Sequence, residues 1–458
     1  MGFGLLCFRQ YYSSCDIDNV CINLALHFDA NYAKMEGHHV FLNVLDQLPL
    51  EARKWLMENG YQEKSEPAKK KAKQDMQGKN KNELKAKRLV QCREMQMFML
   101  KSAGKLFLPD TRADCARHTR QCCSCSYEVA RAPASAKQAL ITAEIVGTSC
   151  QEDSPLGSHL GEAGDNILSA SVWAAKLRAT RPVFFVHECH KNFSPKFFDI
   201  MLEDQYQIFT IDGVDPETHG WPVHRRGRRY TWGVRRDYVL CGSIDNFKQE
   251  FTFKLGCSGK TLYVAPQNEV DKEFKKLLKA RKFSESIPAE AAGPWEGYYT
   301  PSMRDRLRAA QRYFIEKNEG VTEMTEMNAD IEQNVGAGPS PGLLVPTLVT
   351  HGRIYNTHLG RHATALEHLV MQGVPVYGEL QRRMGLKRLP WADYLKNLPE
   401  AAIKKLAGNA MFLPSVIYQQ LYLLSRLRTR SSMQPTNMLR WRRNTLEDLD
   451  ITGFDDDV

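Results

Sequence analysis

Short apolar runs and helix-spaced apolar positions alternate through the middle of the chain. Four runs rich in apolar and aromatic residues predict strands, at residues 140–148, 182–188, 206–214 and 228–234. Between them, residues 166–178 predict an amphipathic helix and residues 193–205 a second helix. Strands that alternate with helices in this way are typical of a doubly wound parallel sheet, so we expect an α/β fold.

The pattern differs toward the amino end. Residues 19–28 have the apolar spacing of a helix, and residues 39–49 predict a short strand with a turn. Residues 60–104 are polar and rich in lysine, which indicates a helical insertion or linker.

The pattern also changes toward the carboxyl end. Residues 240–345 mix strands, charged helices and a Gly/Pro stretch at 336–342, which favours a smaller second domain. Helical spacing returns at residues 361–384 and 390–428.

Length and composition place the chain among ordinary globular proteins. Its 458 residues are enough for two or three domains, and 43% hydrophobic with 25% charged residues is a normal balance. No apolar run approaches the roughly 20 residues that cross a bilayer. The first residues resemble neither a secretory signal nor a transit peptide, so the twelve cysteines indicate reduced thiols in the cytosol or nucleus.

Basic residues are clustered along the chain. The net charge is +9, and the basic groups gather at Lys64–Arg88, at residues 224–229 (HRRGRR) and near the carboxyl end, before an acidic tail. Clustering of this kind favours a polyanionic partner such as nucleic acid. For Lys64–Arg88 alone, a solvated helix face is an equally good interpretation.

Two predicted strands end close to reactive side chains. Cys150 follows the strand at 140–148, and Glu188 ends the strand at 182–188. Ligands of open α/β sheets sit beyond the carboxyl ends of the strands, so we expect this thiol and this carboxyl group to face one crevice. With the nearby arginines they could act on a polarised heterocycle, by attack of sulfur, proton donation and binding of a carbonyl oxygen. Without such partners, Cys150 would be interpreted as a small buried hydrophobic residue.

The order of these motifs resembles the cytosine-5 DNA methyltransferase family. Residues 149–154 (SCQEDS) are similar to its Pro-Cys-Gln-x-x-Ser loop, and residues 188–190 (ECH) stand where the family has Glu-Asn-Val. Gly220-Trp221-Pro222, followed by Arg226 and Arg228, is similar to Gly-x-Pro-Gln-x-Arg-x-Arg with one extra residue.

Motifs near both ends of the chain extend the resemblance. Arg361, Glu367 and residues 372–375 (QGVP) match a late motif, and residues 408–410 (GNA) with the helical stretch after them match the last one. In the amino-terminal part, the resemblance implies that Asp16 and Ile17 bind the ribose and adenine of S-adenosylmethionine. It further implies a cofactor-binding role for Asn43, where the family has Asp, and for Asn409.

The glycine-rich first motif of the family has no counterpart in the fifteen residues before Asp16. We therefore expect the first strand and the methionine-binding loop to be missing through truncation. Asp16 itself has a second interpretation of equal weight, as the cap of a helix that begins near Asn19.

The resemblance implies a Rossmann-like, S-adenosylmethionine-dependent methyltransferase sheet closed by its own C-terminal helix, with a smaller mixed target-recognition domain. The expected parts are the N-terminal part of the catalytic domain (1–59), a Lys-rich and Cys-rich insertion (60–139), the catalytic core (140–239), the target-recognition region (240–345), the C-terminal motifs (346–430) and a tail (431–458).

The implied reaction is methylation of a flipped cytosine in DNA, with S-adenosylmethionine as the donor. Cys150 would add to C6, Glu188 would act at N3, and Arg226 or Arg228 would hold O2. We expect DNA as the partner, no membrane and a nuclear location. The alternatives are a catalytically impaired nucleic-acid-binding protein of the same fold, and an RNA cytosine-5 methyltransferase.

Residues 115–125 (CARHTRQCCSC) hold enough cysteine and histidine for one tetrahedral zinc ion. Paired CxxC knuckles are absent from this stretch, and adjacent cysteines are poor spacing for a closed site. The sequence therefore predicts no metal site.

Overall fold

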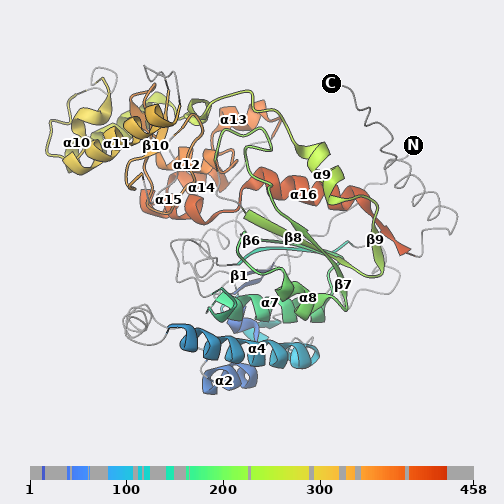
Figure 1. Cartoon of the computed structure of the whole chain (residues 1–458). Coiled ribbons are helices and arrows are strands. Elements are labelled where there is room, and N and C mark those ends of the chain that lie inside the picture. Colours follow the sequence, from blue (N-terminus) through green and yellow to red (C-terminus); the bar gives the residue numbers. More distant parts are fainter. Residues whose placement is uncertain are drawn as a thin grey trace, which may run out of the picture.

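The computed structural model shows a central sheet with helices on both faces, joined to a second group of helices (Figure 1). It describes residues 13–15, 39–41, 44–59, 61, 81–106, 112–115, 118–123, 141–148, 161–164, 166–224, 228–287, 293–318, 326–335, 342–386 and 391–430.

Four strands form the central sheet, in the order β5-β6-β8-β7. They are β5 (Ala143–Gly147), β6 (Phe184–His190), β7 (Tyr206–Ile211) and β8 (Arg228–Arg235). β5 and β6 are parallel, whereas β8 is antiparallel to both of its neighbours. The α/β class and all four predicted strands are confirmed, but the sheet is mixed, not wholly parallel. A strand that follows without a crossover helix pairs antiparallel, and residues 212–224, the described part of the β7–β8 connection, contain no helix.

One face of the sheet is covered by α7 (Asn166–Thr180) and α8 (Lys196–Leu202), with α4 (Lys81–Leu106) and α2 (Leu50–Glu58) outside them (Figure 1). The short η3 (Gly161–Ala163) precedes α7. α7 was predicted to be amphipathic, yet most of it is buried, because α4 packs over its outer side. The α4 residues in this core recur every three or four positions: Cys92, Met95, Met99, Ala103 and Leu106.

The other face is covered by α16 (Leu413–Arg426) and α9 (Ile244–Phe251), next to the antiparallel strands β9 (Tyr238–Leu240) and β13 (Leu427–Thr429). The Trp232 indole in β8 donates a 2.8 Å hydrogen bond to Oε1 of Gln419 and stacks on Tyr422, both in α16. The last described helix, α16, thus closes the sheet, as expected.

The second group contains the remaining described helices and a three-stranded sheet. The helices are α10 (Gln267–Ala280), α11 (Pro301–Lys317), α12 (Ala365–Met371), α13 (Gly378–Arg383), α14 (Trp391–Lys396) and α15 (Glu400–Asn409), with η4 (Gly259–Leu262) and η5 (Trp295–Tyr298). The sheet has the order β10 (Asn328–Asp330), β11 (Ile354–Asn356), β12 (Arg361–His362). β10 lies in the expected recognition region and β11 among the expected C-terminal motifs, so the two parts share one sheet.

Two small sheets lie near the amino end. β1 (Ser13–Cys15) pairs in parallel with β2 (His39–Phe41), and η2 (Val44–Gln47) follows. β3 (Arg112–Cys115) and β4 (Arg120–Cys123) form an antiparallel hairpin. The strand predicted within 39–49 is confirmed, and the helix predicted at 19–28 lies outside the described residues. Among the described helices, none combines the length and apolar character that a membrane span requires.

Candidate active site

Glu188 lies level with the last residue of β5. It pairs across the sheet with Gly147, and a Cβ placed on Gly147 would lie 3.4 Å from Oε2 of Glu188 and 3.5 Å from Sδ of Met411. The carboxylate therefore sits against the bare backbone of β5, beside the segment that joins α15 to α16. Glu188 was expected at a strand end, but β6 continues to His190, because β8 still pairs with Cys189 and His190.

Arg228, the first residue of β8, forms an ion pair with Glu188. Its Nε lies 2.9 Å from Oε1 of Glu188, in a contact that lacks the in-line geometry of a hydrogen bond, and the two side chains are only 17% and 9% exposed. The structure thus brings together two of the four predicted catalytic residues. Arg226 lies outside the described residues. Arg229 turns elsewhere and binds Asp212 through two 2.9 Å hydrogen bonds.

The residue after β5, Thr148, is tied to β6. Its Oγ1 lies 2.8 Å from Nε2 of His187 and 3.7 Å from Sγ of Cys189. The His187 ring is fully buried and stacks on Trp173. Burial lowers the pKa of His187 to about 3, so the imidazole is neutral at physiological pH. Sequence reasoning missed Thr148 and His187, although a histidine inside the apolar run PVFFVHE was a usable signal.

Cys150, the predicted nucleophile, lies outside the described residues. In the sequence it follows Gly147, the residue that pairs with Glu188, by three positions.

Three of the predicted cofactor-binding residues, Asp16, Ile17 and Asn43, lie outside the described residues. The strands before them fit such a site, because β1 and β2 are parallel and Cys15 pairs with Phe41, which brings both carboxyl ends to one edge. The fourth, Asn409, is the exposed last residue of α15, two positions before Met411.

Several residues of the late motifs make packing contacts. Glu367, which is fully buried, accepts hydrogen bonds of 2.8 and 2.9 Å from the Arg361 guanidinium, and also binds the backbone N–H of Thr364 and Ala265. A Cβ on Gly408 would lie 2.5 Å from the backbone nitrogen of Thr350, so only glycine allows α15 to approach there. Gly373 has φ +79° and lies against Pro414, at the start of α16.

Within the described part of the chain, one further group of ligating side chains is gathered outside this site. The thiols of Cys115 and Cys122 and the ring of His118 lie within 4.8 Å of one another in the β3–β4 hairpin. Burial and the neighbouring Cys115 raise the pKa of the Cys122 thiol.

No protein-family model matches the chain, and no curated protein does. Among solved structures, the chain is similar to the S. pombe Dnmt2 methyltransferase, with 14% identity, 62% of this chain and 77% of that chain covered, and a TM-score of 0.33. The Entamoeba histolytica methyltransferase EhMeth gives 13% identity, 64% and 79% coverage and a TM-score of 0.32.

A putative DNA modification methyltransferase encoded within an E. coli prophage gives 17% identity, 65% and 85% coverage and a TM-score of 0.32. All three TM-scores lie below 0.5, a level of similarity from which neither the family nor the activity of this chain follows.

Proposed function

We propose that the chain is a cytosine-5 methyltransferase that acts on DNA, with S-adenosylmethionine as the methyl donor. The observation that carries the proposal is the buried Glu188–Arg228 pair beside Gly147. Gly147 ends β5, and the segment that contains Cys150 follows it in the sequence. A carboxyl group, a guanidinium and a thiol are the groups that activation of a pyrimidine ring requires. A nuclear location is part of the same proposal.

In the proposed reaction, the Cys150 thiolate forms a bond to C6 of a flipped cytosine, and the ring electrons shift toward C5 and N3. Glu188 acts in its protonated form: it donates a hydrogen bond or its proton to N3 as the charge develops there, and takes the proton back when the ring is restored. Arg228 holds the Glu188 carboxyl group in place and supplies N–H donors for O2 of the base. After C5 has gained the methyl group, loss of the C5 proton and of the Cys150–C6 bond restores the ring.

S-adenosylmethionine would supply an electrophilic methyl group on a sulfonium. Asp16, Ile17 and Asn43 would bind it beyond the level ends of β1 and β2, and Asn409 from the end of α15.

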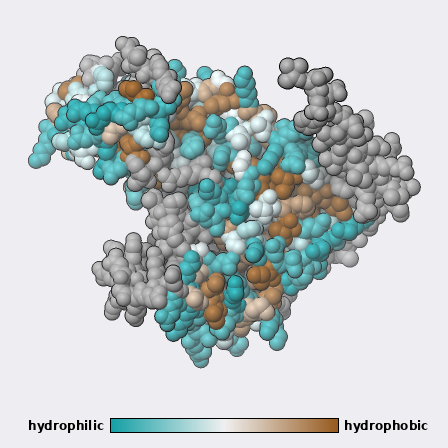
Figure 2. Space-filling view, viewed as in Figure 1, coloured by the Kyte–Doolittle hydropathy of each residue, from teal (hydrophilic) through white to brown (hydrophobic). Residues whose placement is uncertain are grey.

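A row of lysines on α10 supports a polyanionic substrate. Lys272, Lys275 and Lys279 are exposed and recur at three and four positions, so they share one face of the helix. Hydrophilic residues cover much of this part of the surface (Figure 2). α10 lies within the expected recognition region, where phosphate contacts would position the duplex.

The test is covalent trapping on duplex DNA that contains 5-fluorocytosine, with S-adenosylmethionine present. Because fluorine at C5 blocks the release step, the wild-type chain should remain bonded to the DNA, whereas Cys150→Ala should not. Cys257→Ala, which changes an exposed thiol far along the chain, is the matched control and should trap normally. Absence of any wild-type adduct, on DNA and on RNA alike, would overturn the enzyme proposal, and trapping on RNA alone would replace DNA as the substrate.

A further inference from the structure

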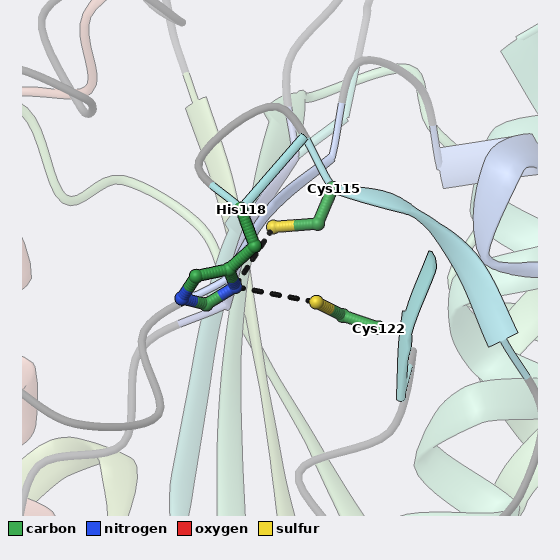
Figure 3. A group of neighbouring side chains, drawn as sticks. All are labelled: Cys115, His118 and Cys122. Carbon is green, nitrogen blue, oxygen red and sulfur yellow. Dashed lines mark hydrogen bonds between the residues drawn. The ribbon is translucent and has the colours of Figure 1, made fainter. Parts of the chain in front are cut away.

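We propose that Cys115, His118 and Cys122 bind a zinc ion in the β3–β4 hairpin. The three side chains come from the last residue of β3, from the turn and from the middle of β4, and they point toward one another (Figure 3). This site is independent of the proposed methyl transfer, and none of its residues is used there.

The spacing of the ligand atoms is that of a tetrahedral zinc site. Zn–S bonds of about 2.3 Å and Zn–N bonds of about 2.0 Å place sulfur and nitrogen about 3.5 Å apart. Nδ1 of His118 lies 3.5 Å from Sγ of Cys115 and 3.2 Å from Sγ of Cys122. A zinc ion therefore needs only small side-chain adjustments.

Hydrogen bonding alone accounts poorly for this arrangement. A ring nitrogen has either one lone pair or one hydrogen, so in either tautomer it makes a single strong hydrogen bond. Here two thiols converge on the same nitrogen, and both sulfurs belong to buried residues. Two thiolates and an imidazole around one cation satisfy all three groups together, and water or another ligand would complete the fourth position.

The hairpin turn holds the three ligands in place. Thr119 has a left-handed φ of +50°, uncommon for a β-branched residue, and its N–H donates a 2.9 Å hydrogen bond to the carbonyl of Cys115. A two-stranded hairpin is only marginally stable in water. Because β3 also packs on β2 and η2, zinc would stabilise the whole amino-terminal corner of the fold.

The experiment measures metal content and thermal stability of the full chain. Purified wild-type protein should carry close to one zinc per chain, and its Tm should fall on treatment with a strong chelator and recover when zinc is added back. Cys115→Ser and Cys122→Ser should each lose the metal, while Cys257→Ser, at an exposed thiol, should retain it.

Cobalt substitution of the wild-type chain provides a measurement that does not depend on the folding of variants. Co²⁺ bound by two thiolates should give a thiolate-to-metal charge-transfer band, which excess zinc should abolish. Failure of the wild-type chain to bind either ion would overturn the proposal. A Cys115–Cys122 disulfide in freshly purified, metal-free protein would also overturn it and would assign the pair to redox chemistry.

Discussion

Thr148 and His187 are joined by a 2.8 Å hydrogen bond between Oγ1 and Nε2, at the point where β5 ends and the segment with Cys150 begins. His187 faces the aromatic cluster around Trp173, whereas Glu188, the next residue along β6, faces the opposite side of the sheet. The neutral His187 ring thus holds Thr148, the residue before the segment with Cys150, while the Glu188 carboxyl group lies on the face where we propose that the substrate binds. We regard Thr148 as a positioning residue.

Replacing Thr148 with valine should keep the shape of the side chain and remove this hydrogen bond. We expect a loss of about 1 to 2 kcal/mol in the free energy of unfolding, because His187 would be left with an unsatisfied buried nitrogen. Methyl transfer should fall mainly through kcat, since the residue before the segment with Cys150 is no longer held. Urea unfolding and single-turnover kinetics measure the two effects. Thr148→Ser restores the hydroxyl and should restore both, and equal losses in Val and Ser variants would contradict the positioning role.

The Glu188–Arg228 pair should show strong energetic coupling. Arg228→Met leaves a carboxylate that is 9% exposed without its cation, and breaking such a pair costs about 3 to 5 kcal/mol. The double variant Glu188→Gln/Arg228→Met should recover much of that loss, because no uncompensated charge remains. Urea unfolding of the wild type, both single variants and the double variant gives the coupling energy. Additive losses would show that the two groups do not support each other.

The row of exposed lysines on α10 should contribute to DNA binding and should not affect the methyl-transfer step. Changing Lys272, Lys275 and Lys279 to glutamine should weaken binding and reduce the salt dependence of log K by about 2 to 3, since each phosphate that a lysine neutralises adds about 0.9 to the slope. Fluorescence anisotropy at several salt concentrations measures this slope. The control changes Lys54, Lys101 and Lys105, exposed lysines on α2 and α4, and should leave the slope as it is. An equal effect in both triple variants would show general charge screening instead of an interface.

The central sheet could be predicted from sequence because each strand is a short apolar run, although β6 ends two residues beyond the predicted end. Phe184–His190 is such a run, and its pairing places Glu188 beside Gly147, as the candidate chemistry required. The orientation of β8 could not be predicted, since it depends on the connection from β7 and not on the residues of β8. The packing of α4 in the core could not be predicted from sequence, because its first turns are polar. Its apolar stripe begins only at Cys92.

The candidate sites were predictable to different degrees. Glu188 and Arg228 could be found from the order of the motifs, because the pairing of the strands that carry them brings the two side chains into contact. The gathering of Cys115, His118 and Cys122 could not be found from ligand spacing, because it depends on the hairpin turn between β3 and β4, where Thr119 has a left-handed φ. Glu367 and Gly408 make packing contacts, which sequence alone does not distinguish from binding contacts.

As the pH falls, the buried histidines should destabilise the fold before the carboxylates become protonated. Burial lowers the pKa of His187 and of His368 to about 3, compared with about 6.5 in the unfolded chain. The unfolded state therefore binds more protons, and the stability that these neutral rings contribute is complete above pH 6.5 and is lost as the pH falls from 6.5 toward 3. Between pH 6.5 and 5.5, each histidine should cost about 1 kcal/mol of unfolding free energy.

Urea unfolding across this pH range tests the linkage. His368→Met removes one titrating ring in α12, so the loss between pH 6.5 and 5.5 should be about 1 kcal/mol smaller than in the wild type. His351→Asn is the matched control, because it removes a ring that is exposed, and the loss should be the same as in the wild type. An unchanged pH dependence in His368→Met would show that this ring takes up its proton in the folded state as readily as in the unfolded chain.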